Sequence, residues 1–309
     1  MRAVALLLAL SIFFLATASR AMNLDDTFHF LTTLIIASTS AGQSQGTGFY
    51  YQHLAPGDPA KSGPQWRAVT NTWLVTNRHV VLPKLGGKEI VPASFAFHLR
   101  RIDGDKLRWE PITLSTDELF KRARFHEDPE VDVAVVDVHD RLIDKIKGGA
   151  TYLQTYLQWY SVSPENFTGQ NNISVQASDD VVVIGYPRGF YDEVNLYPIV
   201  KSGIIASRWG ANFGGKPFFL IDAKLFPGSS GSIVLSKPTD LVVKDSRLFS
   251  AKEKQFAFLG IYSGEPFKLE RPIELAGMII TEKSGFNVGM VWYAHLVEEI
   301  IGHGKSRSP

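Results

Sequence analysis

Three polar residues of the chain have the types needed for nucleophilic hydrolysis. Asp132 stands among valines in the segment 131–136, His79 ends an apolar run, and Ser230 lies in a glycine-rich turn. A serine hydroxyl is a poor nucleophile at neutral pH, and an adjacent histidine, which titrates near ~6.5 when unperturbed, can accept its proton. A buried carboxylate orients that imidazole and stabilises its protonated form. We therefore expect Ser230 as nucleophile, His79 as general base and Asp132 as the orienting acid.

The turn around Ser230 also offers groups that stabilise negative charge. Gly228 precedes Ser230 by two residues, and the turn Gly-Ser-Ser-Gly can direct the backbone N–H groups of Gly228 and Ser230 to one point. Such an oxyanion hole is typically worth about 2.7–4 kcal/mol of barrier for each donor. The absence of a Cβ at glycine leaves room for a substrate carbonyl. Ser232 stands where the Gly-x-Ser-x-Gly motif of lipases has glycine, so this turn is a different motif.

The elements that position these residues are predicted to be short strands. Short apolar runs alternate with turn clusters along the chain, which is typical of an all-β protein. The expected strands are 34–38, 47–52, 67–75, 94–100, 107–113, 131–136, 181–184, 199–207, 218–221, 232–235 and 256–262. Between them, 141–147 and 151–160 have helical patterns. Near the end, Trp292, His295, Leu296 and Ile300 have helical spacing and predict a helix over about 290–302.

The order histidine, aspartate, serine is that of chymotrypsin-type proteases and differs from the order in subtilisins and α/β-hydrolases. Further segments resemble the HtrA/Deg-type branch of trypsin-like peptidases, in order from about residue 30 to 265. They are Gly46-Thr47-Gly48-Phe49, Thr76-Asn77-Arg78-His79-Val80-Val81, Asp132-Val133-Ala134-Val135, Val183-Ile184-Gly185-Tyr186-Pro187-Arg188-Gly189, Ser202-Gly203-Ile204-Ile205-Ala206 and Asp222 to Gly231.

The resemblance implies a fold and a domain organisation. It implies an all-β, chymotrypsin-like fold of two six-stranded antiparallel β-barrels with a C-terminal helix. The barrels are expected over about 30–140 and 181–290, joined by a connection over 141–180. It also implies that Ser263 hydrogen-bonds the carboxylate of Asp132. The implied function is a serine endopeptidase that works through an acyl-enzyme intermediate.

Two differences from the family pattern limit which properties of the family we expect in this chain. Ser229 stands where the family has asparagine and where digestive proteases have the aspartate that pairs with a newly cleaved N-terminus. Activation by N-terminal cleavage is therefore not expected. Nothing that follows Gly264 resembles a PDZ domain, so the peptide sensing that such domains provide is not expected either.

Two alternatives are open for the residues that select the substrate side chain. Lys224 lies six residues before the nucleophile, and a later strand supplies Ser263 and Gly264 as a second wall of the substrate-binding pocket. If Lys224 points inward, it favours an acidic side chain. If instead Leu225 lines the pocket, as the resemblance implies, small or medium aliphatic side chains are favoured. Tyr186 and the neighbouring arginine are expected at the surface.

Composition excludes several other classes. The 309 residues are 45% hydrophobic and 20% charged, with a net charge of +1, which gives no indication of a nucleic-acid partner. The chain has no cysteine, which excludes a thiol protease, a cysteine-ligated metal and disulfides. His126 and His139 lack metal-ligand spacing, so neither a metal nor a cofactor is expected. Polypeptides are the expected partners, and an oligomer is left open.

Residues 1–21 resemble a signal peptide, with Arg2 before an apolar run over 3–15 and small residues around 16–21. We therefore expect a peptidase domain over 22–309 that is secreted or periplasmic, with retention of the segment as an anchor as the alternative. No later stretch is long and apolar enough to span a membrane.

Two further hypotheses remain for the function. One is a catalytically inactive protein of the same fold that holds peptides in its cleft. The other is an enzyme that stays latent until a peptide or an oligomer orders its loops.

Overall fold

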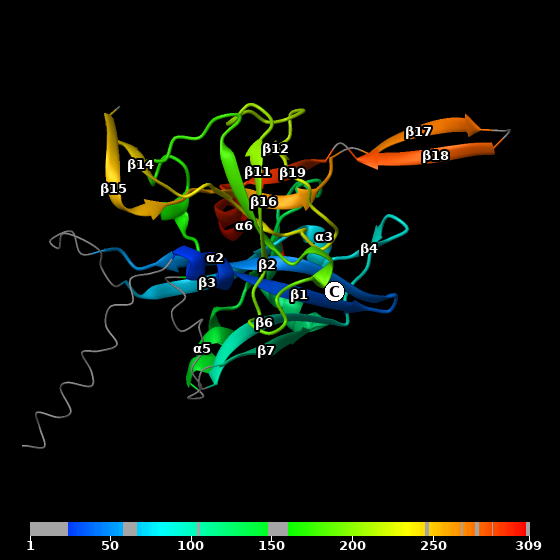
Figure 1. The fold of residues 1–309 in the computed structure, drawn as a ribbon. Coiled ribbons are helices and arrows are strands. Elements are labelled where there is room, and N and C mark those ends of the chain that lie inside the picture. Colours follow the sequence, from blue (N-terminus) through cyan, green and yellow to red (C-terminus); the bar gives the residue numbers. More distant parts are fainter. Residues whose placement is uncertain are drawn as a thin grey trace, which may run out of the picture.

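The computed structural model describes residues 24–57, 67–103, 106–147, 160–244, 247–266, 268–275, 278–285 and 287–306. Its N-terminal half is one antiparallel sheet with the strand order β7-β6-β1-β2-β3-β9-β8 (Figure 1). The strands are β1 (Thr32–Thr39), β2 (Gly42–Leu54), β3 (Val69–Thr76), β6 (Ser94–Asp103), β7 (Lys106–Ser115), β8 (Ala123–Phe125) and β9 (Ala134–Asp137). The expected signal peptide and the segment 151–159 lie outside the described residues.

The C-terminal half is a closed six-stranded barrel in the order β10-β11-β12-β19-β16-β13. Its strands are β10 (Asp180–Gly185), β11 (Ile199–Ile205), β12 (Phe218–Asp222), β13 (Ile233–Ser236), β16 (Phe258–Gly264) and β19 (Val288–Tyr293). This confirms the all-β fold and a six-stranded barrel in the second half. The main sheet of the first half has seven strands in the described ranges, where a six-stranded barrel was expected.

The C-terminal helix α6 spans Leu296–His303, so the expectation that it begins near residue 290 is wrong. Residues 288–293 instead form β19, which closes the barrel. Trp292 pairs with Phe218 of β12 on one side and with Ile261 of β16 on the other. Periodicity alone does not show whether a short apolar run forms a strand or a helix. Here the run forms a strand because it pairs with a strand on each side.

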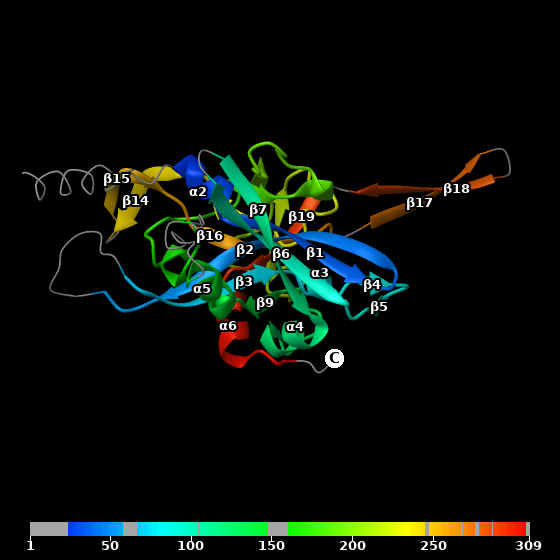
Figure 2. The same cartoon turned by 90° about the horizontal axis from the view of Figure 1, so that it is seen from below.

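The remaining elements are short helices and hairpins that belong neither to the seven-stranded sheet nor to the barrel. They are α2 (Leu24–Phe30), α3 (Arg78–Val81), α4 (Thr116–Arg122), α5 (His139–Lys147), η2 (Pro164–Asn166), η3 (Pro187–Gly189), β4 (Lys84–Leu85) with β5 (Lys88–Glu89), β14 (Thr239–Lys244) with β15 (Arg247–Gln255), and β17 (Lys268–Leu275) with β18 (Met278–Gly285). The hairpins β14–β15 and β17–β18 extend from opposite sides of the molecule (Figures 1 and 2). None of the helices in the described ranges has the length and hydropathy to cross a membrane.

One of the hydrophobic clusters contains residues of both halves. Phe49 of β2 and Phe258 of β16 are both buried and meet edge to face, with ring centroids 5.3 Å apart. Three residues of α6 (Leu296, Val297 and Ile300) belong to the same cluster. Aromatic side chains bury large apolar areas, and this area is lost if the halves separate. The junction between the two halves is therefore well packed, so side chains at this junction are held in fixed positions.

Candidate active site

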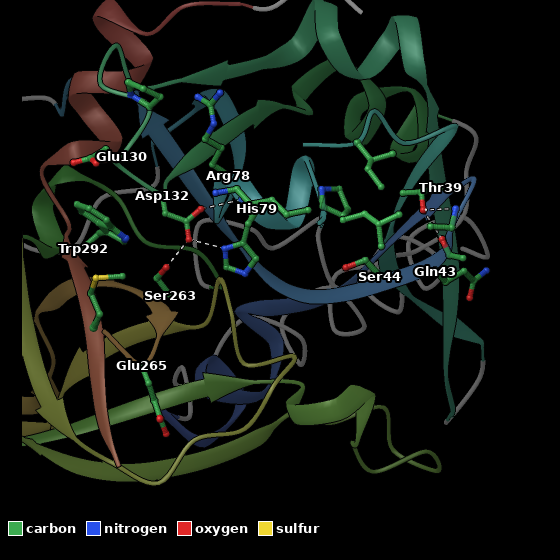
Figure 3. A pocket seen from close by; sticks show the side chains of 18 of the residues that line it. Thr39, Gln43, Ser44, Arg78, His79, Glu130, Asp132, Ser263, Glu265 and Trp292 are labelled. Atoms are coloured by element: carbon green, nitrogen blue, oxygen red, sulfur yellow. Dashed lines mark hydrogen bonds and ion pairs between the residues drawn. The ribbon is translucent and has the colours of Figure 1, made fainter. Parts of the chain in front are cut away.

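The histidine and the aspartate are brought together by neighbouring strands. His79 lies in the one-turn helix α3 directly after β3, and Asp132 lies just before β9, which pairs with β3 at Thr76 and Ala134. The Asp132 carboxylate accepts hydrogen bonds from the His79 backbone N–H (2.9 Å) and from its Nδ1 (2.5 Å; Figure 3). Asn77, fully buried, donates through Nδ2 to the Asp132 carbonyl at 2.7 Å. The imidazole is thereby held with Nε2 free to face a nucleophile.

Ser263 connects this pair to the second half of the molecule. It lies on β16, and its hydroxyl donates to the Asp132 carboxylate at 2.5 Å. This is the contact that the family resemblance implies. The Asp132 side chain is 21% exposed and now accepts three hydrogen bonds. Its position is therefore fixed from both halves.

We expect Ser263→Ala to lower kcat about tenfold, because hydrogen bonds to charged groups contribute about 1.5–3 kcal/mol and this carboxylate is partly exposed. KM for a short peptide should change little, since the hydroxyl contacts Asp132. Steady-state kinetics on a fluorogenic peptide measures both constants. Ser263→Thr keeps a hydroxyl and should restore most of kcat. An unchanged kcat in Ser263→Ala would show that His79 alone positions Asp132.

Ser230 lies on the turn between β12 and β13, which is anchored on both halves. The Thr47 N–H of β2 donates to the Ser230 carbonyl at 2.8 Å, and the Gly231 N–H donates to the Tyr262 carbonyl at 2.8 Å. Gly231 has φ +84°, and a Cβ there would lie 2.0 Å from the Thr47 oxygen. Only glycine allows this close approach.

The Ser230 hydroxyl points toward the end of β16. Its Oγ donates to the Ser263 carbonyl at 3.4 Å, and the hydrogen bonds of the described residues do not include one from Ser230 to His79. If Ser230 is the nucleophile, its side chain must rotate toward the imidazole before attack. Rotations of this kind take picoseconds to nanoseconds for accessible side chains. Ser263 thus contacts Ser230 through its carbonyl and Asp132 through its hydroxyl.

The peptide before Gly228 is held in one orientation. The Arg188 N–H of η3 donates to the Pro227 carbonyl at 2.6 Å, and Gly228 has φ +88°. Because the C=O and N–H of a trans peptide point in opposite directions, the Gly228 N–H points away from Arg188. Within the described residues, no carbonyl or side chain accepts from the N–H of Gly228 or of Ser230. Both N–H groups are therefore without an acceptor among the described residues, as the predicted oxyanion hole requires.

The loop that carries Arg188 was expected at the surface, and part of it is buried. Tyr186 is fully buried, and its hydroxyl accepts from Arg100 Nη2 at 2.7 Å. Arg100 also donates to the Leu196 carbonyl in the same loop, at 3.1 Å. Burial raises the pKa of the Tyr186 hydroxyl, so it stays protonated. Neither Arg100 nor Asn77 stands out in the sequence, because their partners lie far along the chain.

An open cleft of about 1020 Å³ runs along the junction. His79, Asp132 and Ser263 line it, together with the β1–β2 turn on one side and β19 on the other. Figure 3 shows the β1–β2 turn at one end of the cleft and Glu265 beyond Ser263. The cleft can therefore hold an extended chain across the histidine.

Three of the four residues proposed for the substrate pocket, Lys224, Leu225 and Gly264, lie outside this lining, and so does Ser230. Lys224 is exposed to solvent. Leu225 is partly buried and packs against the apolar core of the barrel, which includes Ala223 and Tyr262. Gly264, at the end of β16, has φ +139°. Lys224 therefore extends into water in this arrangement.

The other histidines form ordinary surface contacts. His126 Nε2 lies 2.9 Å from a Glu299 carboxylate oxygen, and its Nδ1 accepts from the Asp128 N–H. His139 lies near the hydroxyl of Thr72. In the part of the chain that the structure describes, no three histidine or acidic side chains are grouped to hold a metal ion.

Several solved proteases resemble the chain in structure. An HtrA-type protease, AlgW with tripeptide, shares 15% identity at a TM-score of 0.46, over 90% of this chain and 60% of its own. The Rv3671c protease from M. tuberculosis, in its active form, shares 16% identity at 0.43, over 95% and 88%. A thermostable serine protease, AL20, from an extremophilic microorganism shares 14% at 0.45, over 89% and 96%. The chain thus spans about 60% of the HtrA-type structure. No curated protein matches the sequence.

A family model matches the sequence directly. The model of the trypsin-like peptidase domain matches residues 46–243, which is more than half of the chain. The matched segment contains His79, Asp132 and the turn of Ser230, the residues that the fold gathers at the junction of its two halves. The chain belongs to the trypsin-like peptidase family.

Proposed function

We propose that this protein is a serine endopeptidase in which His79, Asp132 and Ser230 form the catalytic triad. The observation that carries the proposal is the position of Asp132, which is bonded at 2.5 Å both to His79 Nδ1 and to the Ser263 hydroxyl. This fixes the imidazole in the cleft and supports an arrangement in which it faces the turn of Ser230. A carboxylate in this role keeps the histidine in the tautomer that accepts a proton at Nε2.

In the acylation step, Ser230 Oγ forms a bond to the substrate carbonyl carbon while its proton passes to His79 Nε2. The carbonyl oxygen becomes an oxyanion and accepts hydrogen bonds from the N–H groups of Gly228 and Ser230. The C–N bond then breaks, and His79 gives the proton to the leaving amine. Asp132 stabilises the imidazolium throughout.

Deacylation repeats the sequence with water. His79 takes a proton from the water, whose oxygen bonds to the acyl carbon and again places negative charge in the oxyanion hole. The bond to Ser230 Oγ then breaks, and the serine recovers its proton from His79. The products are a carboxylic acid and the free enzyme.

We place the protein in the secreted or periplasmic fraction, with polypeptides as its substrates. The pattern of residues 1–21 supports a cleaved signal. For the residue before the scissile bond, the exposure of Lys224 argues against selection of an acidic side chain and supports a small or medium aliphatic preference.

A fluorophosphonate probe tests this function. We expect one equivalent of probe on Ser230, found by peptide mass mapping, with parallel loss of hydrolysis of an unfolded protein. Labelling is measured with and without unfolded protein, which separates a constitutively active enzyme from a latent one. A folded protein that is labelled under neither condition would support the peptide-binding alternative.

A further inference from the structure

Two exposed residues of opposite charge line the cleft and lack ion-pair partners among the described side chains. Glu265 lies just beyond β16, and Lys84 begins β4; both are exposed and both line the cleft. Among the side chains that the structure describes, neither forms an ion pair. Each is therefore free to meet a charge on a bound chain.

The other charged side chains of the cleft are neutralised locally. Arg78 donates to Glu89 at 2.7 Å, and the Arg78 side chain is only 15% exposed. Lys216 and Glu130 form a second pair at 2.8 Å, which joins the two halves across the cleft. Among the described residues, these pairs leave Glu265 and Lys84 as the charged side chains of the cleft lining that have no ion-pair partner.

The proposed chemistry determines which part of a substrate lies near Glu265 and which part lies near Lys84. The turn of Ser230 is held against the end of β16 by its backbone, because the Gly231 N–H donates to the Tyr262 carbonyl at 2.8 Å. An acyl group on Ser230 therefore starts beside the end of β16, which leads to Glu265. His79 must protonate the leaving amine, so the leaving segment lies on the histidine side. That side continues from α3 into β4, where Lys84 lies.

We infer that the cleft sorts substrates by charge, favouring a basic residue on the acyl side near Glu265 and an acidic residue on the leaving side near Lys84. The inference rests on the proposed function, because the direction of the chain follows from it. Each exposed pair should contribute about twofold to fivefold to affinity. Reversing both charges exchanges two attractions for two repulsions, so the total difference should be about tenfold. Salt should reduce it, because exposed charges are screened.

Two labelled peptides of identical composition test the inference. One carries arginine on the acyl side and glutamate on the leaving side of a shared neutral core, and the other has the two residues exchanged. Binding to Ser230→Ala is measured by fluorescence anisotropy at low and high ionic strength. We expect the first peptide to bind about tenfold more tightly, with most of the difference lost at high ionic strength. Equal affinities at low ionic strength would overturn the inference.

Charge reversals in the Ser230→Ala background locate the effect. Glu265→Lys should reverse the preference at the acyl side alone, and Lys84→Glu at the leaving side alone. Lys88→Glu, on the same small hairpin outside the cleft lining, and Glu253→Lys, on the distant β15, are matched controls that should keep the preference. If the controls shift it equally, the net charge of the protein is responsible and the inference is wrong. Binding is read without hydrolysis, so a wild-type protein that fails to cleave either peptide contradicts the proposed function separately.

Discussion

Ser230→Ala should reduce peptide hydrolysis to near background, a loss on the order of 10⁶ in kcat. The substitution removes the oxygen that forms the acyl-enzyme and leaves the oxyanion donors and the cleft in place. The fold should be unchanged, because the turn is anchored through the Ser230 carbonyl, which accepts from Thr47, and through the neighbouring Gly231 N–H. Initial rates on a fluorogenic peptide and on an unfolded protein measure the loss, and circular dichroism checks the fold.

The neighbouring serine provides the matched control for this prediction. Ser229 is buried, and its N–H donates to the Phe226 carbonyl. Ser229→Ala should therefore retain most of the wild-type rate. If Ser229→Ala removes activity while Ser230→Ala keeps it, the nucleophile has been assigned to the wrong residue of the turn.

Asp132→Asn should lower kcat by about 10⁴, the loss known for a protease triad in which the orienting acid becomes an amide. The carboxylate accepts from the His79 backbone, from His79 Nδ1 and from Ser263. An amide replaces one acceptor oxygen with a donor, which favours the tautomer with hydrogen on Nε2 and removes the base. KM should change little. The comparison is made by stopped assays over long incubation, since the residual rate is low.

Asp137→Asn is the control for the charge change. Asp137 lies on β9, close in sequence to Asp132, and its carboxylate accepts from the His139 N–H at 3.2 Å. Activity should stay near that of the wild type. A near-normal rate in Asp132→Asn combined with a loss in Asp137→Asn would assign the orienting role to Asp137.

The residues proposed for catalysis were identifiable from the sequence because each lies in a local motif. The fold brings His79 and Asp132 together through β3 and β9 and places the turn of Ser230 against β2. The contacts that the sequence did not indicate are long-range ones. Arg100 on β6 binds the Tyr186 hydroxyl and the Leu196 carbonyl, and Asn77 binds the Asp132 carbonyl. No local period encodes such pairs.

One element of the fold was predicted wrongly and two hairpins were not predicted, again because the local sequence pattern did not determine them. The run 288–293 is short and apolar, so its assignment depended on two partner strands that are distant in sequence. The hairpins β14–β15 and β17–β18 were not predicted, because each pairs within itself and lies outside the barrel, where no buried face imposes a clear alternation.

The contact of Ser263 with both Ser230 and Asp132 has a consequence for how partial unfolding affects activity. His79 and Asp132 belong to the first half, and Ser230 belongs to the second. Ser263 contacts residues of both halves at their junction. In the proposed mechanism, local unfolding that separates the halves would remove the nucleophile from its base before the whole chain has unfolded. A partly denatured molecule would then be inactive, and hydrolysis would report whether the junction is intact.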